Sequence, residues 1–268
     1  MAAFAVTFDL WETLIVDAPE RDMVRNRMRY EGLHKALGDL GVQLPLEELR
    51  RGYEESATRL QAIWRRNEDV STIEQIKMII ELASRQPGVI PPQLGSARLL
   101  EKAYDEDSLF AFPPKLNSDA LRTLKGVRGR GRKIGLICNT GRSSGQSLRR
   151  LLENYGVMRF FDVAVFSNEV GYRKPDRRIY EQAAKRLGVN LEEVVHIGDD
   201  LEADVWGAKQ AGMRAVLYEQ TLPDLTRWEP NSVFVVARAG RHFSRSNVTP
   251  DRRIRSLTEA LDFIDTLP

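Results

Sequence analysis

An isolated acid close to the N-terminus is the first residue whose position suggests chemistry. Asp9 ends a short apolar run that includes Phe4, Val6 and Phe8, and polar residues follow it. An apolar run of this length is typical of a buried strand. In open α/β sheets, ligand sites form beyond the carboxyl ends of the strands. We therefore expect the Asp9 carboxylate to face such a site.

A second polar stretch follows another apolar run, residues 134–138. Asn139, Thr140 and Gly141 come directly after that run and precede a stretch with helical periodicity. Side-chain and backbone donors at such a turn hold the oxygens of an anion, assisted by the N-terminus of the following helix. A turn beside a buried structural cysteine, Cys138, is an equally good interpretation of these residues alone.

A lysine stands at the expected start of a later helix. Lys174 precedes Pro175 and Asp176. Proline and aspartate are favoured at helix N-termini, so this triplet by itself indicates structural capping and nothing more.

Three acids crowd the end of a further apolar strand. Asp199 and Asp200 follow residues 194–197, and Asp204 lies in the first turn of the helix expected next. Acids at a helix N-terminus complement its dipole, which is the structural interpretation. Three carboxylates beside a fourth, Asp9, would repel one another without a cation, and oxygen ligands with room for water suit Mg²⁺. These four residues therefore form a candidate magnesium site.

The elements that must position these residues follow from hydrophobic periodicity. After the two prolines at 113–114, apolar strands alternate with helices, which predicts a parallel, doubly wound sheet. Residues 20–112 instead carry helical periodicity and almost no strand signal. The expected fold class is α/β. A Rossmann-like core is formed by residues 1–16 and 113–268, and residues 17–112 are an inserted all-helical cap domain.

The individual elements are predicted from the same pattern. Strands are expected at residues 4–9, 134–138, 163–166, 194–197 and 215–218. Helices are expected at residues 119–127, 176–187 and 201–211. Residues 219–251 are less regular, and within them the apolar residues 233–236 indicate a short strand. A final amphipathic helix is expected from about residue 254 to 264.

Composition limits the function classes. The chain has 268 residues, and 40 basic against 38 acidic side chains leave a net charge of +2, so no overall field favours nucleic acid. The single cysteine, Cys138, excludes an internal disulfide and fits a reducing compartment. No apolar run approaches the roughly 18 residues that span a bilayer, and no signal peptide is evident. We expect a cytoplasmic protein, monomeric or homodimeric, that binds neither membrane nor nucleic acid.

The order and spacing of the candidate residues resemble the motifs of the haloacid dehalogenase-like hydrolases. The residues that carry the resemblance are Asp9 in the first motif, Asn139 in the second, the characteristic lysine Lys174, and Asp199 and Asp204 in the fourth. The resemblance covers residues 4–218 and the last helix. The helical insertion lies where this family has its C1-type cap domain.

The resemblance implies a role for each residue. The implied catalytic residues are Asp9 as covalent nucleophile, Lys174, which neutralises it and the phosphoryl group, and Thr13. The implied Mg²⁺ ligands are Asp9, the backbone carbonyl of Trp11, Asp199 and Asp204, with Asp200 as an outer group or a helix cap. The implied phosphate contacts are Cys138, Asn139, Thr140 and Trp11. Cys138 stands where the family has Ser or Thr, and a thiol is a weak donor, so these contacts pass to its neighbours.

Trp11 is a departure from the family pattern. Phosphatases of the family carry a second Asp there, which protonates the leaving oxygen and then activates water. Such help contributes about 10²–10⁴-fold, and an indole does not titrate. Glu12 is adjacent, but neighbouring residues on an extended segment point in opposite directions. A substrate with a good leaving group, such as an acyl or aryl phosphate, would not need the acid.

Three functions are compatible with this pattern. We favour a Mg²⁺-dependent phosphatase that acts on a small phosphorylated metabolite through an aspartyl-phosphate on Asp9. The dehalogenase branch attacks carbon, needs no metal and usually lacks the first acid of the fourth motif, which is kept here as Asp199. A third interpretation is a non-catalytic binding protein whose Arg-rich region, residues 227–255, forms a partner surface. In this region, Arg238, Arg241, Arg245 and Phe243 are candidate contacts for nucleic acid, which the near-neutral total charge disfavours.

Three arginines share one early helix. A guanidinium binds carboxylate or phosphate in a bidentate way, so Arg25, Arg27 or Arg29 is a candidate contact for the substrate's distal group. A solvated helix face is the favoured interpretation of most of them.

Overall fold

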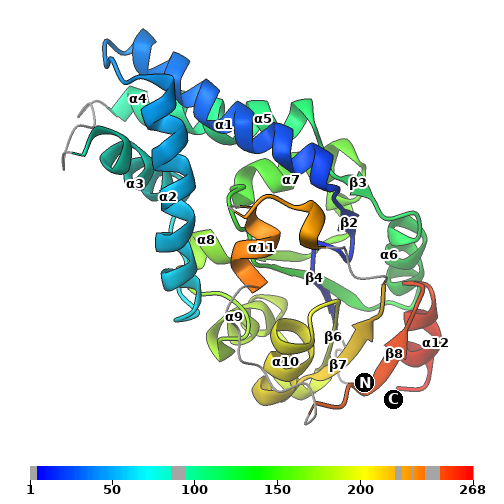
Figure 1. Ribbon diagram of the computed structural model, residues 1–268. Coiled ribbons are helices and arrows are strands. Elements are labelled where there is room, and N and C mark those ends of the chain that lie inside the picture. The colour runs from blue at the N-terminus through cyan, green and yellow to red at the C-terminus, as the bar shows by residue number, and fades with distance from the viewer. Residues whose placement is uncertain (1–4, 86–93, 221–224, 231, 239–247, 268) are drawn as a thin grey trace.

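The core of the protein is a six-stranded parallel sheet (Figure 1). The computed structural model describes residues 5–85, 94–220, 225–230, 232–238 and 248–267. The strands are β1 Ala5–Phe8, β4 Lys133–Cys138, β5 Val163–Phe166, β6 Val194–Gly198, β7 Arg214–Tyr218 and β8 Arg252–Ile254, in the order β5-β4-β1-β6-β7-β8. Every pairing is parallel. The predicted doubly wound α/β fold is confirmed.

Strand β1 lies between β4 and β6. Its Phe8 is opposite Leu136 on β4 and Ile197 on β6, and all four of its residues are buried. A parallel sheet is covered on both faces, which is why these strands are near-continuous apolar runs. Because parallel strands end at one edge, the residues that follow Phe8, Cys138 and Gly198 meet there.

Helices cover both faces of the sheet. They are α6 Ala120–Gly129, α7 Gly145–Asn154, α8 Ser167–Val170, α9 Arg177–Leu187, α10 Gly207–Ala211 and α12 Glu259–Asp265, with the shorter turns η2 Met158–Phe160, η3 Leu191–Glu193, η4 Leu201–Trp206 and η5 Leu225–Arg227. One buried cluster contains Leu124 of α6, Leu148 of α7 and Ile264 of α12. The other contains Ile179 of α9 and Ala208 of α10. The core is therefore a three-layer arrangement.

The helices between the two short strands β2 Ile15–Val16 and β3 Lys115–Leu116 form a group beside the sheet (Figure 1). They are α1 Pro19–Asp39, α2 Leu46–Trp64, α3 Thr72–Ser84, α4 Leu94–Glu101, η1 Lys102–Glu106 and α5 Asp107–Ala111, hereafter the helical unit. Leu33, Tyr53 and Ile79 belong to a buried cluster of this unit. Strands β2 and β3 pair in antiparallel fashion where the chain leaves the core and returns to it.

Local sequence explains two features of the helical unit. Helix α3 begins with a capping box, in which the Glu74 N–H donates to Ser71 Oγ at 3.3 Å and the Ser71 N–H donates to Glu74 Oε2 at 2.9 Å. Helices α2 and α3 approach closely at Gly52, where a Cβ would lie 2.5 Å from the Ile79 carbonyl oxygen. A larger residue at position 52 would force the two helices apart.

The strand predicted at residues 233–236 is wrong, because these residues lie in helix α11, Val233–Arg238. The Val236 N–H donates to the Ser232 carbonyl at 2.8 Å, and Val236 shares a buried cluster with Trp64 of α2. The run of valines favours a strand by propensity, but packing against α2 decides in favour of a helix. Figure 1 shows α11 beside the helical unit.

The end of the chain also differs from the prediction. Ile254 was expected in the final helix, but it ends the edge strand β8, and α12 begins only at Glu259. Of the candidate nucleic-acid contacts, Arg238 ends helix α11, and Arg241, Phe243 and Arg245 lie outside the described residues.

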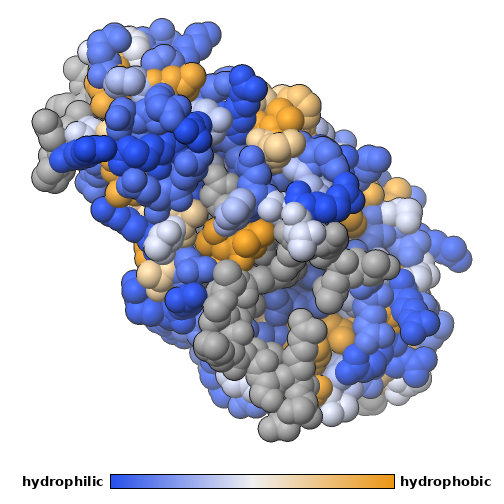
Figure 2. All heavy atoms as spheres, in the orientation of Figure 1, coloured by the Kyte–Doolittle hydropathy of each residue, from blue (hydrophilic) through white to orange (hydrophobic). Residues whose placement is uncertain are grey.

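Across the described part of the chain, every helix is too short or too polar to cross a bilayer. The face of the molecule in Figure 2 is largely hydrophilic, and its hydrophobic atoms form small separate groups.

Candidate functional site

A pocket of about 90 Å³ lies where the carboxyl edge of the sheet faces the helical unit. Acids and bases from both parts line it. The charged and polar lining residues are Asp9, Asp17, Asp22, Arg25, Arg29, Asn139, Thr140, Arg142, Ser143, Arg173, Lys174, Asp199, Asp200 and Asp204, and Trp11 also contributes. Of the predicted site residues, Thr13 and Cys138 lie behind this lining.

Asp9 occupies the first position after β1. Its N–H donates to the Ile197 carbonyl at 2.9 Å, which extends the pairing with β6 beyond the strand. Its Oδ1 accepts from Lys174 Nζ at 2.6 Å, and its Oδ2 accepts from Thr13 Oγ1 at 3.3 Å. The residue is only 6% exposed. Both oxygens of this buried carboxylate therefore have a donor.

The Lys174 ammonium bridges two carboxylates. Its Nζ lies 2.6 Å from Asp9 Oδ1 and 2.6 Å from Asp204 Oδ1. Asn139 fixes the backbone of this lysine, because its Nδ2 donates to the Lys174 carbonyl at 3.0 Å and its Oδ1 accepts from the Lys174 N–H at 2.9 Å. Asn139, expected as a phosphate contact, thus uses its amide to position Lys174. Asp176 caps α9 by accepting from the Arg178 N–H at 2.9 Å.

Three donors hold Asp204. Its Oδ1 accepts from Lys174 and lies 3.0 Å from His196 Nε2, and its Oδ2 accepts from the Asp200 N–H at 2.9 Å. The other nitrogen of His196 lies 2.9 Å from Thr7 Oγ1. His196 is completely buried, and the partners of its two ring nitrogens fix the orientation of the imidazole.

Carboxylates from three positions converge in the pocket. Asp9, Asp199 and Asp204 each offer one oxygen, and these atoms lie within 4.8 Å of one another. Gly198 makes this approach sterically feasible, since a Cβ there would lie 2.3 Å from the carboxyl carbon of Asp204. A set of oxygen donors of this kind suits a hard divalent cation.

The pKa values of the two acids beside Lys174 are shifted in opposite directions. Burial raises the pKa of Asp9 to about 7, and the attraction of Lys174 only partly opposes it. Burial acts in the same direction on Asp204, but Lys174 and His196 outweigh it and lower the pKa of that carboxyl. The pKa of Lys174 is raised despite burial, chiefly by the charge of Asp204. A second positive charge near Asp9 would favour its ionised form.

Asp200 serves as a helix cap. Its Oδ1 accepts from the N–H groups of Glu202 and Ala203, both at 2.9 Å. It lines the pocket, but the converging carboxylates are those of Asp9, Asp199 and Asp204. Of the two interpretations of Asp200, the structure therefore displays the cap.

The turn after β4 buries its cysteine and presents Thr140 to the pocket. Cys138 is completely buried in the core cluster, and burial raises the pKa of its thiol well above the usual value. Thr140 lines the pocket, its N–H donates to Ser167 Oγ at 2.9 Å, and the two hydroxyls lie 3.2 Å apart. Thr140 and Asn139 of this turn therefore line the pocket, and Cys138 does not.

Trp11 lines the pocket close to Asp9 in sequence, and its side chain is half-buried against the core. Glu12 adopts a positive φ of 57° and is buried. Its Oε1 accepts from the Asp17 N–H at 3.1 Å. Glu12 thus fastens the start of the helical unit to the core, and it is not part of the pocket lining.

A family model described as haloacid dehalogenase-like hydrolase matches residues 5–212. The chain belongs to this family. Among curated relatives, a glyceraldehyde 3-phosphate phosphatase of Methanopyrus kandleri is 37% identical over 139 residues, which is 51% of this chain and 56% of the relative. A protein of the same name from Methanothermobacter thermautotrophicus is 36% identical over 107 residues, 39% and 45% of the two chains. The chain thus spans about half the length of these relatives.

Structures of the haloacid dehalogenase-like fold resemble the whole chain. A 2-haloacid dehalogenase from Pseudomonas syringae superimposes with a TM-score of 0.65 at 22% identity, covering 99% of both chains. At this identity the likeness concerns the fold.

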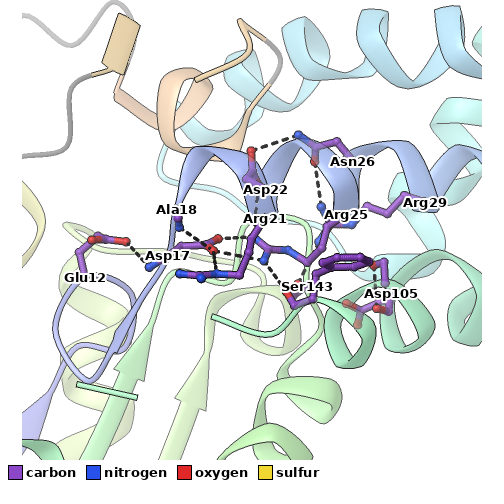
Figure 3. A network of polar contacts seen from close by, with 12 residues as sticks. Glu12, Asp17, Ala18, Arg21, Asp22, Arg25, Asn26, Arg29, Asp105 and Ser143 are labelled. Atoms are coloured by element: carbon purple, nitrogen blue, oxygen red, sulfur yellow. Dashed lines mark hydrogen bonds and ion pairs between the residues drawn. The ribbon is translucent and has the colours of Figure 1, made fainter. Parts of the chain in front are cut away.

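This haloacid dehalogenase-like chain also buries arginines that were expected to be solvated. Arg25 and Arg29 are each 2% exposed, whereas the Arg27 side chain is 70% exposed and pairs with Glu31. Figure 3 shows Arg25 meeting Asp17 in an ion pair at the start of α1. The expectation of a solvated face is therefore wrong for two of the three. The spacing of four residues, which places Arg25 and Arg29 on one face, is the signal that separates them from Arg27.

His196 and Arg142, two further residues of the site, were less clearly indicated by the sequence. His196 is a polar residue inside the buried strand β6, and such a residue needs a partner. Arg142 belongs to the loop after β4, where no periodicity indicates the direction of a side chain. Its guanidinium enters the helical unit and donates to Ser56 Oγ at 3.1 Å.

Proposed function

We propose that this protein is a Mg²⁺-dependent phosphatase that acts on a small phosphorylated metabolite through an aspartyl-phosphate on Asp9. The observation that carries this proposal is the convergence of Asp9, Asp199 and Asp204 beside the ammonium of Lys174. The two relatives named as glyceraldehyde 3-phosphate phosphatases support phosphoryl chemistry for the segments that they match.

The converging side chains fit a magnesium ion. They supply only oxygen donors, and burial disfavours the charged form of Asp9, which a bound cation would stabilise. Asp9 and Asp199 would hold the ion together with the Trp11 carbonyl, and Asp204 would be a further ligand or an anchor. A bound Mg²⁺ would neutralise charge on the oxygens of the transferred phosphoryl group.

Asp9 is the nucleophile in this proposal. A carboxylate oxygen attacks phosphorus, a new P–O bond forms, and the bond to the leaving-group oxygen breaks with its electron pair. The contact with Lys174 keeps a positive charge next to both Asp9 and the phosphoryl group, and the Thr13 hydroxyl restricts rotation of the carboxylate. Water then attacks the aspartyl-phosphate, which releases inorganic phosphate and restores Asp9.

The leaving group receives no proton from position 11. Trp11 faces the pocket without a titratable group, and the adjacent Glu12 is engaged by the Asp17 N–H. The leaving oxygen therefore departs with its negative charge or takes a proton from water. We expect acyl and aryl phosphates to react faster than alkyl phosphates for this reason.

A dehalogenase that attacks carbon with Asp9 is the competing function. The likeness to a 2-haloacid dehalogenase concerns the fold and does not separate the two chemistries. The presence of Asp199 among the converging carboxylates favours phosphoryl transfer, because grouping these acids without a cation is electrostatically costly.

We also propose that residues 17–112 are a C1-type cap domain over a core of residues 1–16 and 113–268. The separate buried cluster of the helical unit supports this division. The pocket supports it as well, since its lining combines residues of α1 with residues at the carboxyl edge of the sheet.

Hydrolysis of p-nitrophenyl phosphate tests the proposed function. We expect turnover with Mg²⁺, loss of turnover with EDTA, and loss in an Asp9→Asn variant whose thermal unfolding shows that it is folded. Halide release from 2-chloropropionate is measured alongside. Turnover that persists in EDTA, or halide release in EDTA, would reject the phosphatase.

A further inference from the structure

Two buried guanidinium groups face the pocket without a carboxylate partner of their own. Arg29 and Arg142 are each 2% exposed, and both line the pocket that contains Asp9. Within the described residues, the hydrogen bonds of both end on neutral acceptors. Arg25 of the same pocket differs, because Asp17 and Asp22 pair with it.

Arg29 has donors to spare. Its two terminal nitrogens donate to Asn26 Oδ1 at 3.0 Å and to Ser143 Oγ at 3.1 Å, and its Nε meets no hydrogen-bond acceptor in the described part of the chain. A guanidinium carries five N–H donors. Figure 3 shows Asp22, Asn26 and Arg29 following one another along α1, with Ser143 on the facing loop.

Two buried acids act on Arg29 without forming an ion pair with it. Asp22 and Asp105 both act on Arg29 electrostatically. The Asp22 carboxylate contacts Arg25 at 3.4 Å and Asn26 at 3.1 Å. Asp105 Oδ2 accepts from the Ser144 N–H at 2.8 Å, and its Oδ1 accepts no hydrogen bond within the described residues. Neither acid therefore closes an ion pair with Arg29.

Arg142 adds a second positive charge from the core side. Its guanidinium donates to Ser56 Oγ, to the Tyr104 hydroxyl at 3.3 Å and to the Tyr53 carbonyl at 3.3 Å, and it lies 4.1 Å from the centre of the Tyr53 ring. These contacts use most of its donors and fix its position. Arg142 acts as a fixed charge that repels Arg29, whereas Arg29 retains capacity for a ligand.

Two like charges buried in one pocket repel each other, and the attraction of Asp22 and Asp105 still leaves Arg29 Nε without an acceptor among the described residues. We propose that Arg29, supported by the charge of Arg142, binds a second anionic group of the substrate, a carboxylate or a second phosphate. This inference rests on the proposed function for the identity of the first group, the phosphate that reacts at Asp9. A planar guanidinium pairs with either anion through two parallel hydrogen bonds.

The proposal narrows the substrate class. The pocket of about 90 Å³ joins Asp9 and Arg29 in one cavity, so the two anionic groups belong to one small molecule. Molecules with only one anionic group, such as simple alkyl phosphates, would leave Arg29 without a ligand. Their rejection follows from the cost of a buried, unpaired charge.

Binding of unreactive phosphonates tests this inference without requiring turnover. The probes are ethylphosphonate, 3-phosphonopropionate and 1,2-ethylenebisphosphonate, which share a two-carbon unit and differ only in the second group. Calorimetry at fixed free Mg²⁺ gives their dissociation constants. We expect at least one of the two doubly anionic probes to bind about ten- to a hundredfold more tightly than ethylphosphonate, and the tighter one identifies carboxylate or phosphate.

Variants then assign the difference to Arg29. Arg29→Met should reduce that affinity ratio to about twofold or less, and Arg29→Lys should retain an intermediate ratio because it keeps the charge. Arg27→Met, on the exposed face of the same helix, is the matched control and should keep the wild-type ratio. If Arg29→Met does not fold, the second anion site is tested by comparing the affinity ratio of the wild type with that of Arg29→Lys, and an equal ratio in the two proteins would contradict it.

The outcomes separate this inference from the proposed function. Equal affinities for all three probes, no binding of any probe, or an unchanged ratio in Arg29→Met would overturn the second anion site. A preserved ratio in a protein that hydrolyses no phosphomonoester would instead reject the phosphatase and leave the anion site standing. Hydrolysis of p-nitrophenyl phosphate together with equal affinities for the three probes would support the phosphatase and reject the second anion site.

Discussion

The Lys174 ammonium lies 2.6 Å from Asp9 and 2.6 Å from Asp204, so one buried cation is shared by two acids from different elements. Asp9 follows β1 and Asp204 lies in η4, and the lysine itself precedes α9. The sharing is unequal, because the pKa of Asp204 is lowered while that of Asp9 is raised to about 7. Asp9, the position where the proposed reaction takes place, thus holds its proton more readily than Asp204, and a further positive charge would be needed to keep it fully ionised.

Replacing Lys174 by methionine should affect both activity and folding. Removal of one partner of a buried ion cluster leaves uncompensated charge, so we expect a loss of about 3–5 kcal/mol in the free energy of unfolding. Activity on p-nitrophenyl phosphate should fall by at least about 10²-fold. Urea unfolding and steady-state kinetics measure the two effects. Lys185→Met on the exposed side of α9 is the control and should change stability by less than about 0.5 kcal/mol; wild-type turnover in Lys174→Met contradicts its proposed role.

Asp199 and Asp200 should differ in their effect on metal dependence. Asp199→Asn removes a charge from the converging carboxylates, so the Mg²⁺ concentration for half-maximal activity should rise about tenfold or more. Asp200→Asn keeps a residue that caps helices well, so its Mg²⁺ requirement should stay close to that of the wild type. Titrating activity with Mg²⁺ distinguishes them. Equal shifts in both variants would mean that Asp199 is not a ligand.

Trp11→Asp should restore a proton donor beside the nucleophile. We expect kcat/KM for an alkyl phosphate to increase by up to about 10²-fold, and much less for p-nitrophenyl phosphate, whose leaving group needs no acid. The ratio of the two kcat/KM values is the measurement. Trp11→Asn, which removes the indole without adding an acid, is the matched control. An equal gain in both variants would indicate that the indole only limits access.

Gly198→Ala should disturb the carboxylate cluster by steric contact alone. A Cβ at this position would lie 2.3 Å from the carboxyl carbon of Asp204, so we expect a loss of about 1–3 kcal/mol in unfolding free energy together with weaker Mg²⁺ activation. Gly38→Ala, where no atom lies within 4 Å of the added Cβ, should instead be neutral or stabilising by up to about 1 kcal/mol. Comparable stability in the two variants would contradict the steric argument.

The sequence by itself determined the core of the fold. Short apolar runs alternating with helices predicted the parallel sheet, and the structure confirms strands β4 to β7 close to the predicted positions. Periodicity is a local property that each segment carries alone, which is why it can be read without coordinates. The acids after β1 and β6 were recognisable for a related reason, since parallel strands bring their carboxyl ends to one edge.

Only the tertiary structure decided which partners the side chains have. Asn139 holds the backbone of Lys174, Asp200 caps a helix, and residues 233–238 form a helix because α2 offers an apolar surface. Arg29 and Arg142 come from segments far apart in the sequence and enter one pocket. Such contacts depend on how separate elements pack, and no local pattern of residue types encodes the distance between them.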